Sequence, residues 1–421
     1  MKSIYQKTVL PDGLRIISET IPTVRSITIG LWIDAGSRDE TAQMNGISHF
    51  IEHMVFKGTT NRSAKQIATY LESVGGILNA FTSREQTCFY AKIIDERLPQ
   101  AVEILADLAF NSLFDSSEIE KEKNVIIDEI NEVNDTPADL VHDLFANSLF
   151  GDHSLGRPIL GSSSTVLNLS RGKIIDHIKK YYQKSNMLIA ASGNLEHKKL
   201  VDLVNKYFAE DRKDKSMKLK RIKPQLFPGL NVTFKETNQT HICIGSPALK
   251  YEHPERPTLL LLNSIIGGGM SSKLYQRIRE ELGLAYTIFS YLDFFIDASV
   301  IGVYLNTDKK HVVTAILAVL KELTKLKDNE LDSKEIETAK EQLKGSLILG
   351  LENTSNRMNR MAKHEFLLGR YISVGEAISE INKITAYDIK NLAEIVFQAD
   401  KFTITVLGPV SERTVEKAIN L

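Results

Sequence analysis

One stretch of this chain occurs twice in recognisable form. The segment FDSSEIEKEK, residues 114–123, has a counterpart in LDSKEIETAK, residues 331–340, and the later run KIIDHIKKYYQKSNMLIAASGNL is matched in pattern by YDIKNLAEIVFQADKFTITVLGPV. A single hydrophobic core stops growing at roughly 250 to 300 residues, whereas this chain has 421. We therefore expect two similar domains in tandem.

A charged stretch separates the two halves. Residues 209–228, AEDRKDKSMKLKRIKPQLFP, carry two prolines and few large apolar side chains. Such a composition is typical of a linker. The expected boundaries are a first domain over residues 1–210, a linker over 211–228 and a second domain over 229–421.

Strand-like and helix-like segments alternate within each half. Runs rich in β-branched and aromatic residues predict strands at LRIISET, SITIGLWIDAG, GILNAF, TCFYAKII and NMLIAASGN. Apolar residues recur at helical spacing over 98–110 and over 117–133. Because several predicted strands are close neighbours in the chain, we expect an α+β fold, with a mostly antiparallel mixed sheet packed with helices in each domain.

Composition excludes several partner classes. A net charge of −1, with 43% hydrophobic and 25% charged residues, favours neither nucleic acid nor an anionic membrane. No apolar run reaches the roughly 18 residues that a membrane span needs. The start, MKSIYQKTVLPDG, lacks the apolar core of a secretory signal. We expect a cytoplasmic protein of a bacterial type, with an organellar matrix as the alternative.

The segment ISHFIEHMVFKG, residues 47–58, contains His49, Glu52 and His53. On a helix, residues four apart differ by about 40° in direction, so both imidazoles can reach one ion. Glu52 points to the same side and can contact a water on that ion. A zinc-bound water has a pKa near 7, and a carboxylate can take its proton during attack on a carbonyl. The alternative is a buried helix face whose histidines are satisfied by hydrogen bonds.

A third ligand is expected from the helix EIEKEKNVIIDEINEV. Glu122 and Glu129 are seven residues apart, so they project in nearly the same direction from this helix, at the border of its apolar stripe. The same helix also carries Glu118, Glu120 and Glu132, and spacing alone does not choose the ligand among the five. The second half has no His-x-x-Glu-His, and the repeat places Ala339 and Ser346 where the first half has Glu122 and Glu129. Any chemistry is therefore expected in the first half.

Five segments together resemble the M16 (pitrilysin-type) zinc metallopeptidases, and most of all their processing-peptidase branch. They are HFIEH, GGILNAFTSREQT, EKEKNVIIDEINEVNDTP, LGRPILG and GGGMSSKLYQRIREELGLAY. The resemblance implies that His49, His53 and Glu129 bind Zn²⁺ and that Glu52 is the general base. Glu122 matches a second helix glutamate, which takes part in catalysis and supports the metal site.

The resemblance also implies how substrate is bound. Arg279 and Tyr286 match a pair that binds substrate and stabilises the developing oxyanion, although their segment also reads as an ordinary charged helix. The segment with Asn79, Ala80 and Phe81 matches an edge strand to which an extended peptide adds. Asp139 and Asp143 match acidic positions that receive a basic side chain near the scissile bond; the alternative is two solvated carboxylates.

For the whole chain, the resemblance implies one half of a clamshell that encloses short or unfolded polypeptides. A zinc endopeptidase is expected, with a homodimer favoured over a heterodimer with an inactive homologue, because one chain carries both the zinc motif and the Arg279/Tyr286 pair. The alternative is a catalytically silent structural or peptide-binding subunit of a larger assembly. Silent relatives lose ligands of the zinc motif, and this chain keeps them.

Overall fold

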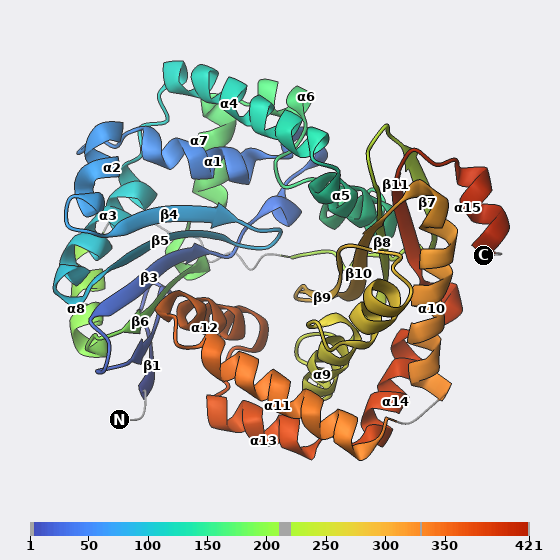
Figure 1. Ribbon diagram of the computed structural model, residues 1–421. Helices are drawn as coiled ribbons and strands as arrows, with labels where there is room; N and C mark the ends of the chain where they lie inside the picture. The colour runs from blue at the N-terminus through green and yellow to red at the C-terminus, as the bar shows by residue number, and fades with distance from the viewer. Residues whose placement is uncertain (1–3, 210–219, 329–330, 420–421) are drawn as a thin grey trace. The chain divides into compact units, whose positions relative to one another are not determined.

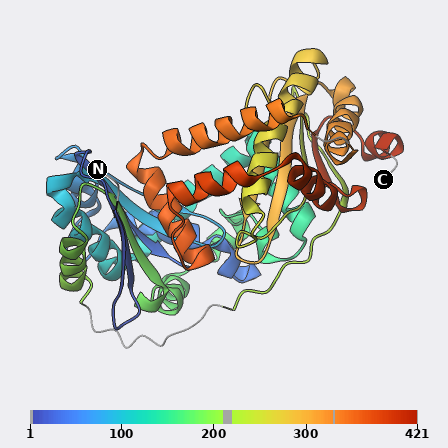
Figure 2. The same ribbon diagram turned by 90° about the horizontal axis from the view of Figure 1, so that it is seen from below.

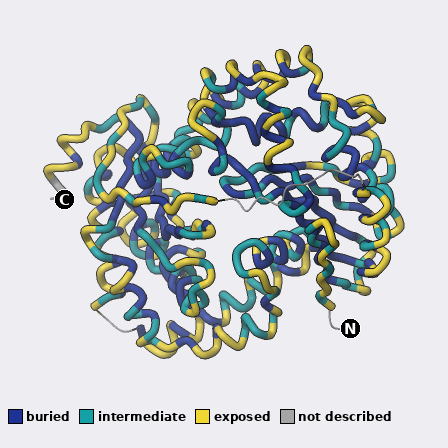
Figure 3. Tube along the Cα trace, turned by 180° about the vertical axis from the view of Figure 1, so that it is seen from behind, coloured by how far each residue is buried: buried dark blue, intermediate teal, exposed yellow. Residues whose placement is uncertain are grey.

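The computed structural model describes residues 4–209, 220–328 and 331–419. The chain forms two compact units. The first comprises Met1–Glu132, Arg157–Ile222 and Gly350–Tyr371, and the second comprises Val133–Gly156, Lys223–Leu349 and Ile372–Leu421. The central strands of each sheet are the most continuously buried parts of the trace, and outward-facing helical turns are exposed (Figure 3).

The first unit is built on a sheet of six strands among its described residues (Figure 1). Only β2 and β6 are parallel neighbours in this sheet; the other pairs are antiparallel. β4 is at one edge of the sheet, and the β1–β2 hairpin, the dark blue pair of strands in Figure 2, is at the other. In order across the sheet, the strands are β1 (Ile4–Val9), β2 (Arg15–Thr20), β6 (Met187–Gly193), β3 (Ser26–Ile33), β5 (Thr87–Ile94) and β4 (Ile77–Thr82).

Helices cover one face of this sheet and bury a continuous apolar core that includes Phe50 and Phe89. They form where apolar residues recur at helical spacing: on α1, for example, Ile47, Ile51 and Met54 are fully buried. The helices are α1 (Ile47–Met54), α2 (Ala64–Glu72), α3 (Leu98–Asn111), α4 (Ser116–Asp135), α6 (Ser163–Leu167), α7 (Arg171–Tyr181) and α8 (His197–Tyr207).

The described part of the second unit contains a five-stranded sheet that repeats the order and directions of the first from β2 onward. Its one parallel pair, β7 with β11, corresponds to β2 with β6. In order, the strands are β7 (Gly229–Phe234), β11 (Thr403–Gly408), β8 (Thr240–Pro247), β10 (Ser299–Thr307) and β9 (Ile288–Phe294). The expected α+β fold with two similar halves is confirmed.

Helices of the second unit bury a core of their own against this sheet. They are α9 (Arg256–Gly267), a π-helix (Tyr275–Glu281), α10 (Val312–Asp328), α11 (Ser333–Gly350), α13 (Val374–Lys383), α14 (Ala386–Val396) and α15 (Glu412–Ile419). The duplicated segments begin α4 and α11, as the repeat in the sequence requires. Over the described residues, no helix is both long and apolar enough to cross a membrane.

Two helices belong to the unit of the opposite half. α12 (Thr354–Leu368) follows α11 in the chain but packs on β2, β3 and β6 of the first unit, whereas α5 (Pro137–Phe150) follows α4 and packs on β8 and β11 of the second (Figure 1). Each covers a sheet face that is lined by apolar side chains. Gly30 allows close approach, since a Cβ there would lie 2.9 Å from Met358 Sδ.

The compact units therefore divide the chain differently from the expected boundaries 1–210 and 229–421. The difference has a physical reason: each sheet has two apolar faces, and the second face of each is covered by a helix from the other half of the sequence, α12 for the first sheet and α5 for the second. Of the expected linker 211–228, residues 211–219 lie outside the described residues. Residues 221 and 222 belong to the first unit.

Candidate metal centre

The N-terminal turn of α1 is held by a buried carboxylate. Glu40 is 6% exposed. One of its oxygens accepts hydrogen bonds from the backbone N–H of Gly46, at 2.8 Å, and from Asn45 Nδ2, at 3.1 Å, and the other accepts from the N–H of Ser48, at 2.8 Å. The carboxylate satisfies helix-terminal donors that would otherwise be unpaired. It therefore fixes the start of the helix that carries the three site residues.

The structure brings His49, His53 and Glu129 together, within one unit. Nε2 of His49 lies 3.6 Å from Oε2 of Glu129, and Nε2 of His53 lies 3.7 Å from the same oxygen. One nitrogen or oxygen atom from each of the three residues lies within 4.8 Å of the others. α4 lies beside α1 and supplies the carboxylate (Figure 1).

These donors fit a divalent cation. Two imidazoles and one carboxylate are the ligand types of catalytic zinc sites, and bonds of 2.0–2.2 Å place tetrahedral donors about 3.4 Å apart. In the described part of the chain, Oε2 of Glu129 is buried without a hydrogen-bond partner, as is Nδ1 of His49. Burial, together with the neighbouring His53, lowers the pKa of His49 to about 4, so its ring is neutral, as a metal ligand must be.

Glu122 lies behind His53 rather than among the ligand atoms. Its Oε1 is 2.8 Å from Nδ1 of His53, and its Oε2 is 2.6 Å from Nζ of Lys57. When Nδ1–H donates to this carboxylate, the lone pair of Nε2 is left for a metal. The pKa of Glu122 is lowered: burial acts to raise it, but the hydrogen bonds to His53 and Lys57 outweigh burial.

Glu52 is held by the sheet. Its Oε2 accepts a hydrogen bond of 2.6 Å from Oγ1 of Thr82, the last residue of β4. Burial raises the pKa of the Glu52 carboxyl, although the bond from Thr82 and the nearby charge of His53 lower it. A carboxylate with a raised pKa is suited to take a proton near neutral pH.

The predicted edge strand is present. Asn79, Ala80 and Phe81 lie on β4, which pairs with β5 and forms one edge of its sheet. Asn79 Oδ1 accepts from the N–H of Ala80 at 2.8 Å, and the ring of Phe81 packs edge-on against Trp32. β4 and β5 form a hairpin, with Thr82 opposite Thr87 and residues 83–86 in its turn.

The other expected substrate residues belong to the second unit. Arg279 and Tyr286 are brought together: the guanidinium carbon lies 4.9 Å from the centre of the Tyr286 ring, which is 72% exposed. The segment of Arg279 is a π-helix over Tyr275–Glu281, a form that recurs at functional sites.

Asp139 and Asp143 lie on α5, which the compact division assigns to the second unit rather than to the unit with the metal ligands. Asp139 is exposed and Asp143 is half-buried. Both act electrostatically on His142, which lies between them in the sequence.

Sequence reasoning missed three residues of the site: Glu40, Lys57 and Thr82. Lys57 follows His53 by one helical turn, so helical spacing pointed to it. Thr82 directly follows Phe81, so the signal in the sequence was a hydroxyl at the end of the predicted edge strand. Glu40 acts through a loop that folds back on the helix, and no spacing rule predicts that contact.

Comparison of sequences relates each half of the chain to known proteins. Residues 15–163 match the profile described as "Insulinase (Peptidase family M16)", and residues 168–343 match "Peptidase M16 inactive domain". The first match contains the three clustered donors, whereas the second match covers most of the half that has no His-x-x-Glu-His.

Curated relatives match along almost their whole length. A Bacillus subtilis protein named "Uncharacterized zinc protease YmxG" is 40% identical over 94% of this chain and 97% of its own length. A Streptomyces coelicolor protein, also named as a zinc protease, is 37% identical over 97% of this chain and 90% of its own. The crystal structure of a protease from Helicobacter pylori has the same fold, with a TM-score of 0.90 at 21% identity over 97% of this chain and all of that one.

Proposed function

This chain belongs to peptidase family M16, and from that membership we propose that it is a zinc-dependent endopeptidase. The observation that carries the proposal is the convergence of His49 Nε2, His53 Nε2 and a Glu129 oxygen beside Glu52. Relatives named as zinc proteases support Zn²⁺ as the ion. His49, His53 and Glu129 would hold it.

In the proposed mechanism, Glu52 is the general base. A zinc ion held there would supply a water of lowered pKa and would polarise the scissile carbonyl. Glu52, kept in place by Thr82, accepts the proton of the attacking water and delivers it to the leaving amine. Glu122 holds the His53 ring through Nδ1, which would leave Nε2 to bind the ion, and Lys57 balances the charge of Glu122.

We propose that the substrate binds as an added strand. The outer edge of β4, with Asn79, Ala80 and Phe81, offers main-chain groups to an extended peptide next to α1. Such binding tolerates many sequences, which suits short or unfolded polypeptides. Asp139 and Asp143 would add a preference for a basic side chain near the scissile bond, and Arg279 with Tyr286 would stabilise the oxyanion.

A catalytically silent subunit is the second candidate. The match of residues 168–343 to an inactive domain supports silence of the second half, not of the whole chain. The first half keeps both histidines, the glutamate donor and the adjacent base. We therefore favour a peptidase.

Replacing the base tests the proposal. Glu52→Gln keeps the shape of the side chain and all three metal donors, so zinc content should stay at one ion per chain. Peptide cleavage should fall at least about 100-fold, because a general base contributes about 10²–10⁴. His53→Ala should lose the ion as well. Metal analysis and a digest of an unbiased peptide mixture measure both.

A matched control is Glu120→Gln, which removes a carboxylate that is 70% exposed on α4. It should keep both zinc and activity. Cleavage by Glu52→Gln at the parent rate would show that another group is the base. A parent protein that binds zinc but cleaves no peptide would favour the silent subunit.

The same digest tests the basic preference, which should disappear in the double variant Asp139→Asn, Asp143→Asn.

We further propose that the enzyme is a homodimer in the cytoplasm of a bacterial-type cell. The zinc donors and the Arg279/Tyr286 pair stand in one chain, so no second gene product need supply either. Light scattering of the purified chain should give twice the mass of 47.2 kDa. A mass of one chain would contradict the homodimer.

A further inference from the structure

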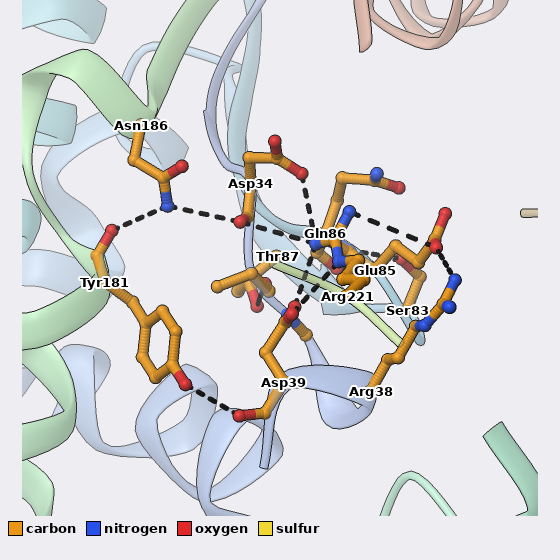
Figure 4. A network of polar contacts seen from close by, with 12 residues as sticks. Asp34, Arg38, Asp39, Ser83, Glu85, Gln86, Thr87, Tyr181, Asn186 and Arg221 are labelled. Carbon is orange, nitrogen blue, oxygen red and sulfur yellow. Dashed lines mark hydrogen bonds and ion pairs between the residues drawn. The ribbon is translucent and has the colours of Figure 1, made fainter. Parts of the chain in front are cut away.

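Five charged side chains meet at the turn of the β4–β5 hairpin (Figure 4). Arg221 comes from the segment after α8, Asp34 and Asp39 from the end of β3 and the turn that follows, and Arg38 and Glu85 from that turn and the hairpin. Four of the five side chains are at most 7% exposed, and Asp34 is 25% exposed. Charges so deeply buried are costly unless they are paired.

Arg221 connects the members of this cluster. Its Nε and Nη2 bind both oxygens of Asp39, at 3.0 and 2.8 Å, and Nη2 also lies 3.1 Å from Oδ1 of Asp34. The same Nη2 donates to the backbone carbonyl of Glu85 at 2.8 Å. One guanidinium thus joins the end of β3 to the hairpin turn, with the forked geometry that lysine cannot reproduce.

The hairpin turn is attached to the same place by its backbone. The N–H of Arg38 donates to the carbonyl of Arg84 at 2.7 Å. Gly36 makes this approach possible, because a Cβ there would lie 2.3 Å from the carbonyl oxygen of Ser83. Arg38 also binds Glu85 at 2.6 Å and the carbonyl of Ile222 at 2.6 Å. The chain at 221–222 is therefore fastened to the hairpin from two directions.

The turn begins one residue after Thr82, whose hydroxyl holds Glu52. We propose that Arg221 is a positioning residue: by fixing the β4–β5 turn, it sets the place of Thr82 and of the outer edge of β4, and through Thr82 that of Glu52. Arg221 itself touches neither a metal donor nor the base. The consequence for catalysis rests on the proposed peptidase function, whereas the consequence for the hairpin does not.

Loss of Arg221 removes the cation that binds both oxygens of buried Asp39 and lies beside Asp34. Repulsion and the cost of unpaired buried charge should then open the turn, which shifts the whole of β4 because its strand partner lies on one side only in the described sheet. Arg221→Lys keeps the positive charge but loses the forked guanidinium geometry. It should therefore prevent only part of this opening of the turn. Lys223→Ala removes an exposed cation two residues away and is the matched control.

Amide hydrogen exchange of the metal-free protein tests whether Arg221 fixes the β4–β5 turn, and it does not depend on activity. In Arg221→Ala, the segment 77–94 should exchange at least about tenfold faster than in the parent, while α3 and the second unit stay unchanged. Lys223→Ala should exchange like the parent. Unchanged exchange over 77–94 in Arg221→Ala overturns the proposal, as does a uniform increase throughout the first unit, which would mean general destabilisation.

A kinetic cycle tests the path through Thr82. Arg221→Ala should lower kcat about tenfold at full zinc content, because small misplacements of catalytic groups are costly. In a Thr82→Val background the same change should lower kcat less than about twofold, since the hydroxyl that transmits the effect is gone. If the factors by which Arg221→Ala and Thr82→Val each lower kcat simply multiply in the double variant, the proposed path through Thr82 is wrong. If the parent has no peptidase activity, the proposed function fails. Hydrogen exchange alone then decides whether Arg221 fixes the β4–β5 turn.

Discussion

Nδ1 of His53 lies 2.8 Å from Oε1 of Glu122, and this contact determines which imidazole nitrogen is free for a metal. Glu122 is 3% exposed and also binds Lys57, so the pair is held in place from behind. The arrangement gives Glu122 a role that is distinct from that of Glu129, although the two lie on the same side of α4.

Glu122→Ala should weaken zinc binding about 10- to 100-fold, because partners of a metal-bound histidine orient the ring and raise its basicity. Competition with a chelator at fixed pH measures the affinity. Glu120→Ala, on the exposed side of the same helix, is the control and should bind zinc like the parent. An unchanged affinity in Glu122→Ala would mean that His53 is oriented by its packing alone.

Glu40 should make stability depend on pH. Burial raises its pKa from 4.5 to about 7, although hydrogen bonds from Ser48, Asn45 and Gly46 act to lower it. The folded state therefore binds this proton more tightly than the unfolded state. The stabilising contribution is fully present below pH 4.5 and is lost as pH rises through about 7.

We expect the free energy of unfolding of the metal-free parent, relative to that of Glu40→Gln, to fall by roughly 3 kcal/mol across this range, since one pKa unit corresponds to about 1.4 kcal/mol. Urea titrations at several pH values measure the difference. A difference that instead grows with pH would show that the donors at the start of α1 keep the carboxylate ionised.

Met358→Ala should destabilise the first unit although residue 358 belongs to the second half of the sequence. Met358 is 1% exposed and packs with Trp32 against the sheet face that α12 covers. Truncations of this kind cost about 2–5 kcal/mol. Trp32 is the only tryptophan in the chain, so its fluorescence reports the transition directly. Met270→Ala, at a side chain 72% exposed, should change nothing measurable.

Both thiols should be unreactive in the native protein. Cys88 and Cys243 are fully buried and free, and burial raises the pKa of each above its usual value. Since the thiolate is the reactive form, a thiol reagent at pH 8 should label neither residue until the chain is unfolded, and then both. Ser117→Cys, at an exposed position, should react at once and shows that the reagent is active. Rapid labelling of the folded parent would reveal local opening at one of the two sheets.

Local pattern was enough to predict several elements of the first half. The run from Leu98 to Phe110 has apolar residues at helical spacing, and α3 follows it to within one residue. The strands β3 and β5 lie within segments rich in β-branched and aromatic residues. These signals are local, because helix and strand each impose a periodicity on the residues that face the core. The repeat in the sequence predicted two similar halves, and the second sheet has the order of the first from β2 onward.

For the site, the sequence by itself determined that His49, Glu52 and His53 share one side of α1, because that depends only on helical geometry. It left five glutamates of α4 open until the family resemblance chose Glu129. Tertiary structure decided that Glu129 reaches both imidazoles while Glu122 stands behind one of them. It also decided that α5 and α12 cover the sheets of the opposite halves, and that Arg221 meets Asp39 and Glu85 at the hairpin turn. Such contacts join residues far apart in the chain, and they form because buried faces and buried charges must find partners wherever the fold places them.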